Sequence, residues 1–184
     1  MESLAGRLLV ASPLLLDPNF HRSVVLMCAH DARGAFGVVL NRPLGFALPR
    51  ELAAWAPRLS EPPTVFHGGP VAPEQVLALA RLVEGAPPLE GWSRVAGRVG
   101  LLDLEREDLA EHPSIEAVRL FAGHAGWGGG QLEGEIGGEA WFVLDARESD
   151  AFAASTERLW NEVLGRQPSR LGLLKHYPPD VSLN

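Results

Sequence analysis

Two uninterrupted apolar runs near the start of the chain, joined by a short polar turn, constrain the fold most. They span residues 23–29 and 36–40, and the segment between them ends in Gly34. Such runs are typical of strands buried on both faces, and a short connection containing glycine predicts a β-hairpin. Pro43 lacks the N–H that a ladder needs, so we expect pairing to stop there. A hairpin argues against a purely parallel, doubly wound sheet.

The rest of the chain mixes strand and helix patterns. Strands are expected at 64–67, around 99–102, at 117–121 and at 140–144. Helical spacing or composition predicts helices at 48–55, 105–111 and 131–136, and a longer helix that begins at Ser149 or Asp150 and runs to about residue 164. Residues 75–80 look helical by propensity, and the proline-rich tail 177–184 is expected to be extended. The resulting fold class is α+β with a mixed, largely antiparallel sheet.

Composition bounds the function classes. With 184 residues, 46% of them hydrophobic, one domain over residues 1–184 is expected. A net charge of −7 and the lack of a helix-turn-helix pattern argue against direct nucleic-acid binding. The only cysteine, Cys28, excludes an intrachain disulfide and is expected to be a buried, inert thiol. No apolar stretch is long enough for a transmembrane helix, so we expect a cytoplasmic protein that does not contact a membrane.

A glycine-rich segment follows the strand predicted at 117–121. It has glycines at 123, 126, 128, 129 and 130, and Trp127 lies among them. A strand, a glycine loop and a helix start can hold an anion on free backbone N–H groups. However, no Gly-Lys-Ser or Gly-Lys-Thr is present, and the spacing is not Gly-x-Gly-x-x-Gly, so neither nucleotide motif fits. Two hypotheses stay open: a ligand-contacting loop, or a structural turn with Trp127 packed on the core.

Polar residues gather just before the first apolar run. Asp17 and Asn19 can make side-chain turns, and Arg22 offers a planar fork for a carboxylate or phosphate. A structural ion pair between Asp17 and Arg22 is the alternative.

The titratable residues show no metal or nucleophile motif. None of the six histidines lies in a zinc-binding pattern, and no Gly-x-Ser-x-Gly is present, so we expect no metal and no cofactor. His30, His67 and His124 are predicted at strand ends. Glu133 and Glu135 follow the glycines and can act as acid and base, or as simple partners of a helix dipole.

Four ordered blocks resemble the YqgE/AlgH family of small bacterial proteins. They are 17–24, 34–43, 68–71 and 123–135, and the last is the most specific. The resemblance implies a mixed sheet that curls towards a barrel with helices outside, and a strand rather than a helix at about 76–79. The family has no established enzymatic activity, although one branch is labelled a regulator of alginate transcription. The chain departs from the family pattern at His124, where an aromatic is common, and at Gly129.

Together these observations predict a non-enzymatic binding or regulatory protein with one surface for an anionic small molecule or peptide. The partner's identity and the oligomeric state stay open. One alternative is a hydrolase or transferase that uses Asp17, His30 or Glu133, and another is a transcriptional regulator that does not bind DNA directly. The predicted surface comprises Asp17, Asn19, Arg22, His30, Asn41, Gly68, Gly69, Pro70, His124, Gly126, Trp127, Gly128, Gln131 and Glu133.

Overall fold

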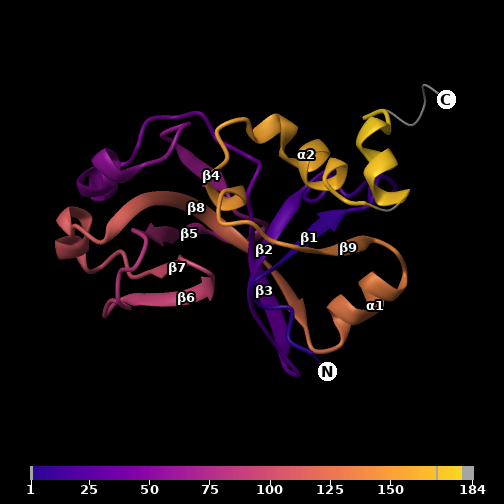
Figure 1. Ribbon diagram of the computed structural model, residues 1–184, viewed down its shortest axis with the longest axis horizontal. Coiled ribbons are helices and arrows are strands. Elements are labelled where there is room, and N and C mark those ends of the chain that lie inside the picture. Colours follow the sequence, from indigo (N-terminus) through magenta and orange to yellow (C-terminus); the bar gives the residue numbers. More distant parts are fainter. Residues whose placement is uncertain (1, 169, 180–184) are drawn as a thin grey trace.

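The computed structural model describes residues 2–168 and 170–179, which fold around one curled sheet (Figure 1). The strand order is β6-β7-β5-β8-β3-β2-β1-β9, and the short β4 pairs with β8 in parallel, whereas all other pairs are antiparallel. The expected α+β fold with a largely antiparallel sheet is therefore confirmed. The strands are β1 (Arg7–Ala11), β2 (Val24–Asp31), β3 (Gly34–Val39), β4 (Val65–His67), β5 (Val71–Leu82), β6 (Trp92–Ala96), β7 (Val99–Leu102), β8 (Ile115–Gly128) and β9 (Trp141–Asp145).

Helices are short and lie outside the sheet. Two are α-helical, α1 (Gln131–Gly137) and α2 (Leu159–Gly165). The 3-10 helices are η1 (Arg50–Arg58), η2 (Glu107–Glu111), η3 (Asp150–Phe152), η4 (Thr156–Arg158) and η5 (Arg170–His176). No helix within the described ranges is long and apolar enough to cross a membrane.

The predicted hairpin is present and longer than expected. β2 and β3 pair from Val25 with Val39 to Asp31 with Gly34, so only two residues form the turn. The segment at 75–80 is a strand, as the resemblance implied, because β5 is flanked by β7 and β8 on its two sides. Ladder bonds on both sides override the helical propensity of its alanines and leucines.

One helix prediction was wrong and one strand was missed. The expected single helix from 149 or 150 to about 164 is divided into η3, η4 and α2, and Ser149 makes no capping bond. Asp150 instead accepts a hydrogen bond from the backbone N–H of Arg147 and forms a buried ion pair with Arg166 at 2.6 Å. Strand β6 was not foreseen. In the tail, residues 177–179 form no helix, and residues 180–184 lie outside the described part.

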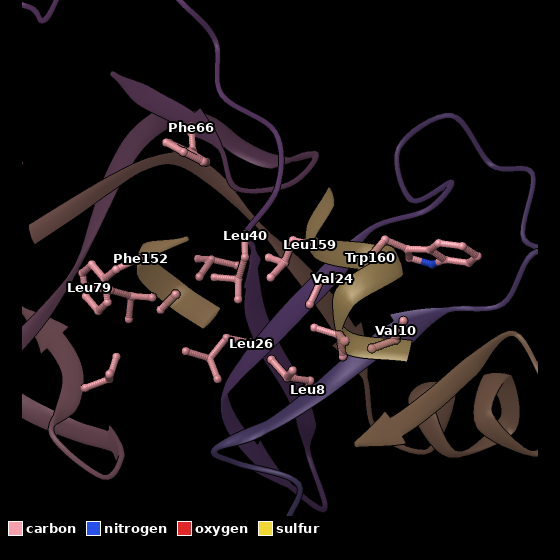
Figure 2. Close-up of a cluster of buried hydrophobic side chains, with 14 of the residues drawn as sticks. Leu8, Val10, Val24, Leu26, Leu40, Phe66, Leu79, Phe152, Leu159 and Trp160 are labelled. Carbon is pink, nitrogen blue, oxygen red and sulfur yellow. The ribbon is translucent and has the colours of Figure 1, made fainter. Parts of the chain in front are cut away.

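The largest core cluster lies between the sheet and the C-terminal helices (Figure 2). Leu8, Val10, Val24 and Leu26 come from β1 and β2, and Trp160 of α2 covers them while its indole N–H donates to a carbonyl of β1 at 2.9 Å. The predicted inward-facing residues of the C-terminal segment are all buried here: Phe152, Leu159, Trp160 and Val163. A second cluster lies between α1 and the other face of the same strands, and a third fills the end of the sheet around Trp55 and Trp92.

Candidate functional site

The fourteen predicted site residues do not share one surface. Arg22 precedes β2 and His30 lies near its far end, so about eight strand residues, or about 25 Å, separate them. The residues instead fall into three groups: the segment 17–22 with Asn41, the contact between residues 68–70 and β8, and the end of the hairpin beneath α1. Each group has a structural explanation.

The segment 17–22 is held by its own hydrogen bonds. The Asp17 carboxylate accepts the backbone N–H of Asn19 at 2.8 Å, which is the predicted side-chain turn. Arg42, which the sequence did not single out, donates to the carbonyls of Pro18 at 2.9 Å, Asn19 at 2.6 Å and His21 at 3.0 Å. Burial lowers the pKa of Arg42, and the charge of Asp17 partly offsets that effect. This guanidinium therefore fixes the shape of the segment.

Arg22 is a structural anchor rather than a free anion-binding fork. Its guanidinium donates to the carbonyl of Tyr177 at 3.0 Å and to the side chain of Asn161 at 3.4 Å, and it lies 4.1 Å from the centre of the Trp160 ring. Partial burial lowers its pKa. The Asn41 side chain fixes the backbone next to Arg22. Its amide oxygen accepts the N–H of Val24 at 3.0 Å, and its amide nitrogen donates to the Arg22 carbonyl at 2.9 Å. The alternative structural ion pair between Asp17 and Arg22 does not form; Arg22 instead joins Tyr177, the residue after η5, to Asn161 of α2.

The glycine-rich segment is not a loop, which corrects the prediction. β8 continues through it to Gly128, and burial alternates between inward Ala125 and Trp127 and outward Gly126 and Gly128. His124 points outward, and its ring packs edge-on against Phe36 at 5.8 Å. The segment is therefore a strand up to Gly128, and only Gly129 and Gly130 separate it from α1. The Gly128 N–H, one of the groups that an anion cradle would use, is already bonded to Gln131.

Gly68 and Gly69 are required by close backbone packing. A Cβ on Gly68 would lie 2.2 Å from the Gly123 carbonyl oxygen, and one on Gly69 would lie 2.2 Å from the His124 carbonyl carbon. Gly69 also has φ +150°, which L side chains rarely adopt. β4 pairs with β8 in parallel. The chain then turns at Gly68-Gly69-Pro70, and the two glycines allow this turn to pack directly against the backbone of β8.

Trp127 packs in the core, as the structural hypothesis predicted. Its indole N–H and that of Trp141 both donate to the same oxygen of Glu135, each at 2.9 Å. Gln131 donates to the other oxygen at 3.0 Å and accepts the backbone N–H of Gly128 at 3.0 Å. Glu135 therefore fixes α1 to the sheet, a role that the sequence did not indicate.

His30 and Glu133 form a second link to α1. The His30 side chain is only 2% exposed; its Nδ1 accepts the backbone N–H of Leu4 at 3.0 Å, and its Nε2 is 2.8 Å from Glu133. This pattern requires Nδ1 to be the acceptor and Nε2 to carry the proton. The pKa of Glu133 is lowered by a hydrogen bond from its own backbone and by one from His30, so its stabilising contribution is present above the ordinary carboxyl pKa and is lost as pH falls through the lowered value.

Replacing His30 tests this link. We expect His30→Ala to cost about 2 kcal/mol of stability, because it removes two hydrogen bonds from a buried ring, and to speed amide exchange at Leu4 and in α1. Urea unfolding and hydrogen exchange measure both effects. Glu133→Gln is the matched control, since an amide oxygen still accepts from Nε2, and its unfolding midpoint should stay close to wild type. Unchanged exchange at Leu4 in His30→Ala would contradict the assignment.

The structure does not bring Asp17, His30 and Glu133, the residues of the acid–base alternative, together at one site. Asp17 lies at the opposite end of β2 from His30 and Glu133, and both ring nitrogens of His30 are already bonded. Among the described residues, no group of three or more His, Cys, Asp or Glu side chains could hold a metal ion. Cys28 is half-buried, and burial raises the pKa of its thiol to about 12.

Hollows of about 300 and 340 Å³ lie beside His30. A further concave site, which the sequence did not indicate, lies away from the predicted residues. This site, the Phe142 cleft, has a volume of about 460 Å³ and lies between the segment after β1, the turn before β9, and η5. Leu14 on its rim is 74% exposed, and Glu139 is the one charged residue that the described part of the chain contributes to the lining. The lining residues are mostly apolar and come from three segments that are far apart in the chain. In the sequence they could not be distinguished from residues of the hydrophobic core. The lining residues are Ser12, Pro13, Leu14, Leu15, Gly138, Glu139, Ala140, Phe142, Leu174 and Tyr177.

Comparison with known proteins gives consistent matches over nearly the whole chain. A family model described as AlgH-like matches residues 8–172. A UPF0301 protein of Streptomyces coelicolor is 48% identical, covering 100% of this chain and 97% of its own. A crystal structure from Corynebacterium diphtheriae superposes with a TM-score of 0.89 at 32% identity, over 96% of this chain and 94% of that one. The solution structure of the AlgH protein from Pseudomonas aeruginosa superposes with a TM-score of 0.69 at 27% identity, over 96% and 95%.

Proposed function

We propose, from the premise that this chain belongs to the AlgH-like family, that it is a non-enzymatic binding protein whose ligand site is the Phe142 cleft. The observation that carries the proposal is an exposed leucine, Leu14, on the rim of an apolar cleft of about 460 Å³. Exposed apolar surface beside a cleft is typical of an interaction site.

The family's motif residues support this choice because their polar groups are already occupied. Arg22 bonds Tyr177 and Asn161, and His30 bonds Leu4 and Glu133. By contrast, the walls of the Phe142 cleft come from Leu14, Leu15, Phe142, Leu174 and Tyr177, which present apolar surface to solvent. Arg22 acts on the cleft indirectly, since it holds the Tyr177 backbone in place.

The chemistry of the lining revises the expected ligand. Among the described residues, no cationic side chain lines the Phe142 cleft and the acidic Glu139 is the one charged residue there, so an anionic group is a poor fit. A small molecule enclosed within the cleft would leave the exposed Leu14 on the rim in contact with water. A protein partner that extends over the rim would cover it. The ligand we propose is therefore a peptide segment of a protein partner that inserts an apolar side chain.

A random peptide library displayed on phage tests the proposal. Peptides selected on the wild-type protein should share an apolar residue and should bind Leu14→Asp at least about ten-fold more weakly. Phe46→Asp is the matched control, because Phe46 is also an exposed apolar residue, at 53%, but does not line the cleft. Selected peptides that bind Leu14→Asp and wild type equally well would overturn the proposal.

A further inference from the structure

The two edge strands of the sheet, β6 and β9, differ in how well they are protected against pairing with a strand of another chain. At one edge, β6 exposes Ser93 and Arg94, and its ladder with β7 shifts register between Arg94 and Ala96. Charge and irregularity of this kind prevent a second chain from adding to an edge strand. At the other edge, β9 reads Trp-Phe-Val-Leu-Asp and pairs with β1 through five residues without a shift. Only its last residue is charged.

The backbone groups on the outer side of β9 can be identified from its pairing with β1. The N–H of Ser12 donates to the carbonyl of Ala140, in the same register as the β1–β9 ladder. Because bonded positions alternate in an antiparallel pair, Phe142 also bonds to β1, and the N–H and C=O of Trp141 and Val143 point away from the sheet. β9 is the last strand in the order, and within the described residues it pairs on one side only. Figure 1 shows it between α1 and the C-terminal helices.

The sequence around β9 is self-complementary about Val143. Glu139 lies four residues before Val143 and Arg147 lies four residues after it, and both are exposed. Neither makes an ion pair with another described residue. Both residues lie beyond the ends of β9: Glu139 is in the turn after α1, with φ +60°, and Arg147 is two residues past Asp145. If two β9 strands paired antiparallel around a two-fold axis at Val143, these ends would lie side by side, with Glu139 of each copy near Arg147 of the other. Phe142 would face Leu144 across the strands, an apolar cross-strand pair.

From this arrangement we infer that the chain forms a symmetric homodimer in which β9 pairs with β9 of a second copy and extends the sheet across the interface. The Asp145 carbonyl already accepts a hydrogen bond from Arg166 at 3.3 Å, so the remaining outward groups of Trp141, Val143 and Asp145 make about four hydrogen bonds across the pairing. Opposite charges at both ends set the register, and a one-residue slip would separate them. The two Phe142 clefts then lie on either side of the axis, so the dimer carries two ligand sites.

Sedimentation equilibrium over a concentration series tests the dimer. We expect the wild type to dimerise and Val143→Pro to raise the dissociation constant at least about ten-fold. Proline removes an outward N–H while leaving the bonds to β1 intact, so the monomer should keep its fold by circular dichroism. Arg94→Pro on the opposite edge β6 is the matched variant and should leave dimerisation unchanged. The Asp103 N–H donates to the Gly91 carbonyl, so by the same alternation the N–H of the exposed Arg94 points away from β7.

Charge reversal gives a second, independent measurement. Glu139→Arg or Arg147→Glu alone should weaken the dimer several-fold by placing like charges opposite each other, and the double variant should recover most of the wild-type affinity. A wild type that stays monomeric throughout the series overturns the inference and leaves the edge to an extended peptide. A dimer that tolerates Val143→Pro, or charge effects that simply add, also overturns it. Peptide binding at the cleft is measured with Leu14→Asp, so the two proposals can fail separately.

Discussion

Gly69→Ala is expected to destabilise the protein by more than about 4 kcal/mol, which is a large fraction of the total stability of an average domain. The added methyl group would lie 2.2 Å from the His124 carbonyl carbon and 2.3 Å from its oxygen. Both contacts are with backbone, so β4 and β8 would have to separate. The φ of +150° adds strain that an alanine cannot relieve in place. Urea unfolding followed by circular dichroism measures the loss.

A second glycine provides the control for this prediction. Gly134 lies inside α1, and a Cβ added there would meet nothing within 4 Å. Gly134→Ala should therefore leave stability unchanged or raise it by about 0.5–1 kcal/mol, since alanine favours helix. If Gly69→Ala had wild-type stability but lost ligand binding, the glycine would serve a ligand and not the fold.

Arg119→Met is expected to cost about 3 kcal/mol or more. Arg119 is 1% exposed in the middle of β8 and lies 4.4 Å from the centre of the Phe66 ring. Its guanidinium donates to the carbonyls of Ala153 at 2.9 Å, Glu61 at 2.5 Å and Ala151 at 3.3 Å. Methionine keeps most of the apolar contact but leaves these carbonyls without their donor, and unpaired buried acceptors cost about 1–3 kcal/mol each before relaxation.

The charge state of Arg119 does not change this expectation. Burial lowers its pKa to about 10, which still leaves it protonated at neutral pH. Arg94→Met is the control, because Arg94 is exposed and its guanidinium contacts only near neighbours in the chain among the described residues. It donates to the Gly97 carbonyl at 2.7 Å and lies 5.6 Å from the centre of the Trp92 ring. Differential scanning calorimetry should show a lower Tm for Arg119→Met and a Tm close to wild type for Arg94→Met. Equal Tm values would show that Arg119 does not join the loops at Glu61 and Ala153 to the sheet.

The sequence predicted the parts of the fold that depend on local pattern. The hairpin of β2 and β3, the strand β9 and the short helix α1 each have a continuous apolar run or helical spacing. The long strand β8 was foreseen only to Phe121, because glycines at 123, 126 and 128 are typical of loops. They are accommodated in a strand here since the neighbouring backbones of β3 and residues 68–70 pack directly against it.

The candidate site was predicted less well, for a related reason. The segments with unusual residues were found, but their composition alone does not distinguish bonds within the protein from bonds to a ligand. Arg22 shows this most clearly, because its partners Tyr177 and Asn161 are more than a hundred residues away in the chain. The Phe142 cleft has the opposite problem, since its apolar lining looks like core until the three segments are assembled.

The measurement that most directly tests this account is a chemical-shift map of a selected peptide bound to the ¹⁵N-labelled protein. If the motif residues stabilise the fold and the Phe142 cleft binds the ligand, the shifts should concentrate at Leu14, Leu15, Phe142, Leu174 and Tyr177. Shifts centred instead on His30, residues 68–70 and His124 to Gln131, with the cleft residues unchanged, would contradict it.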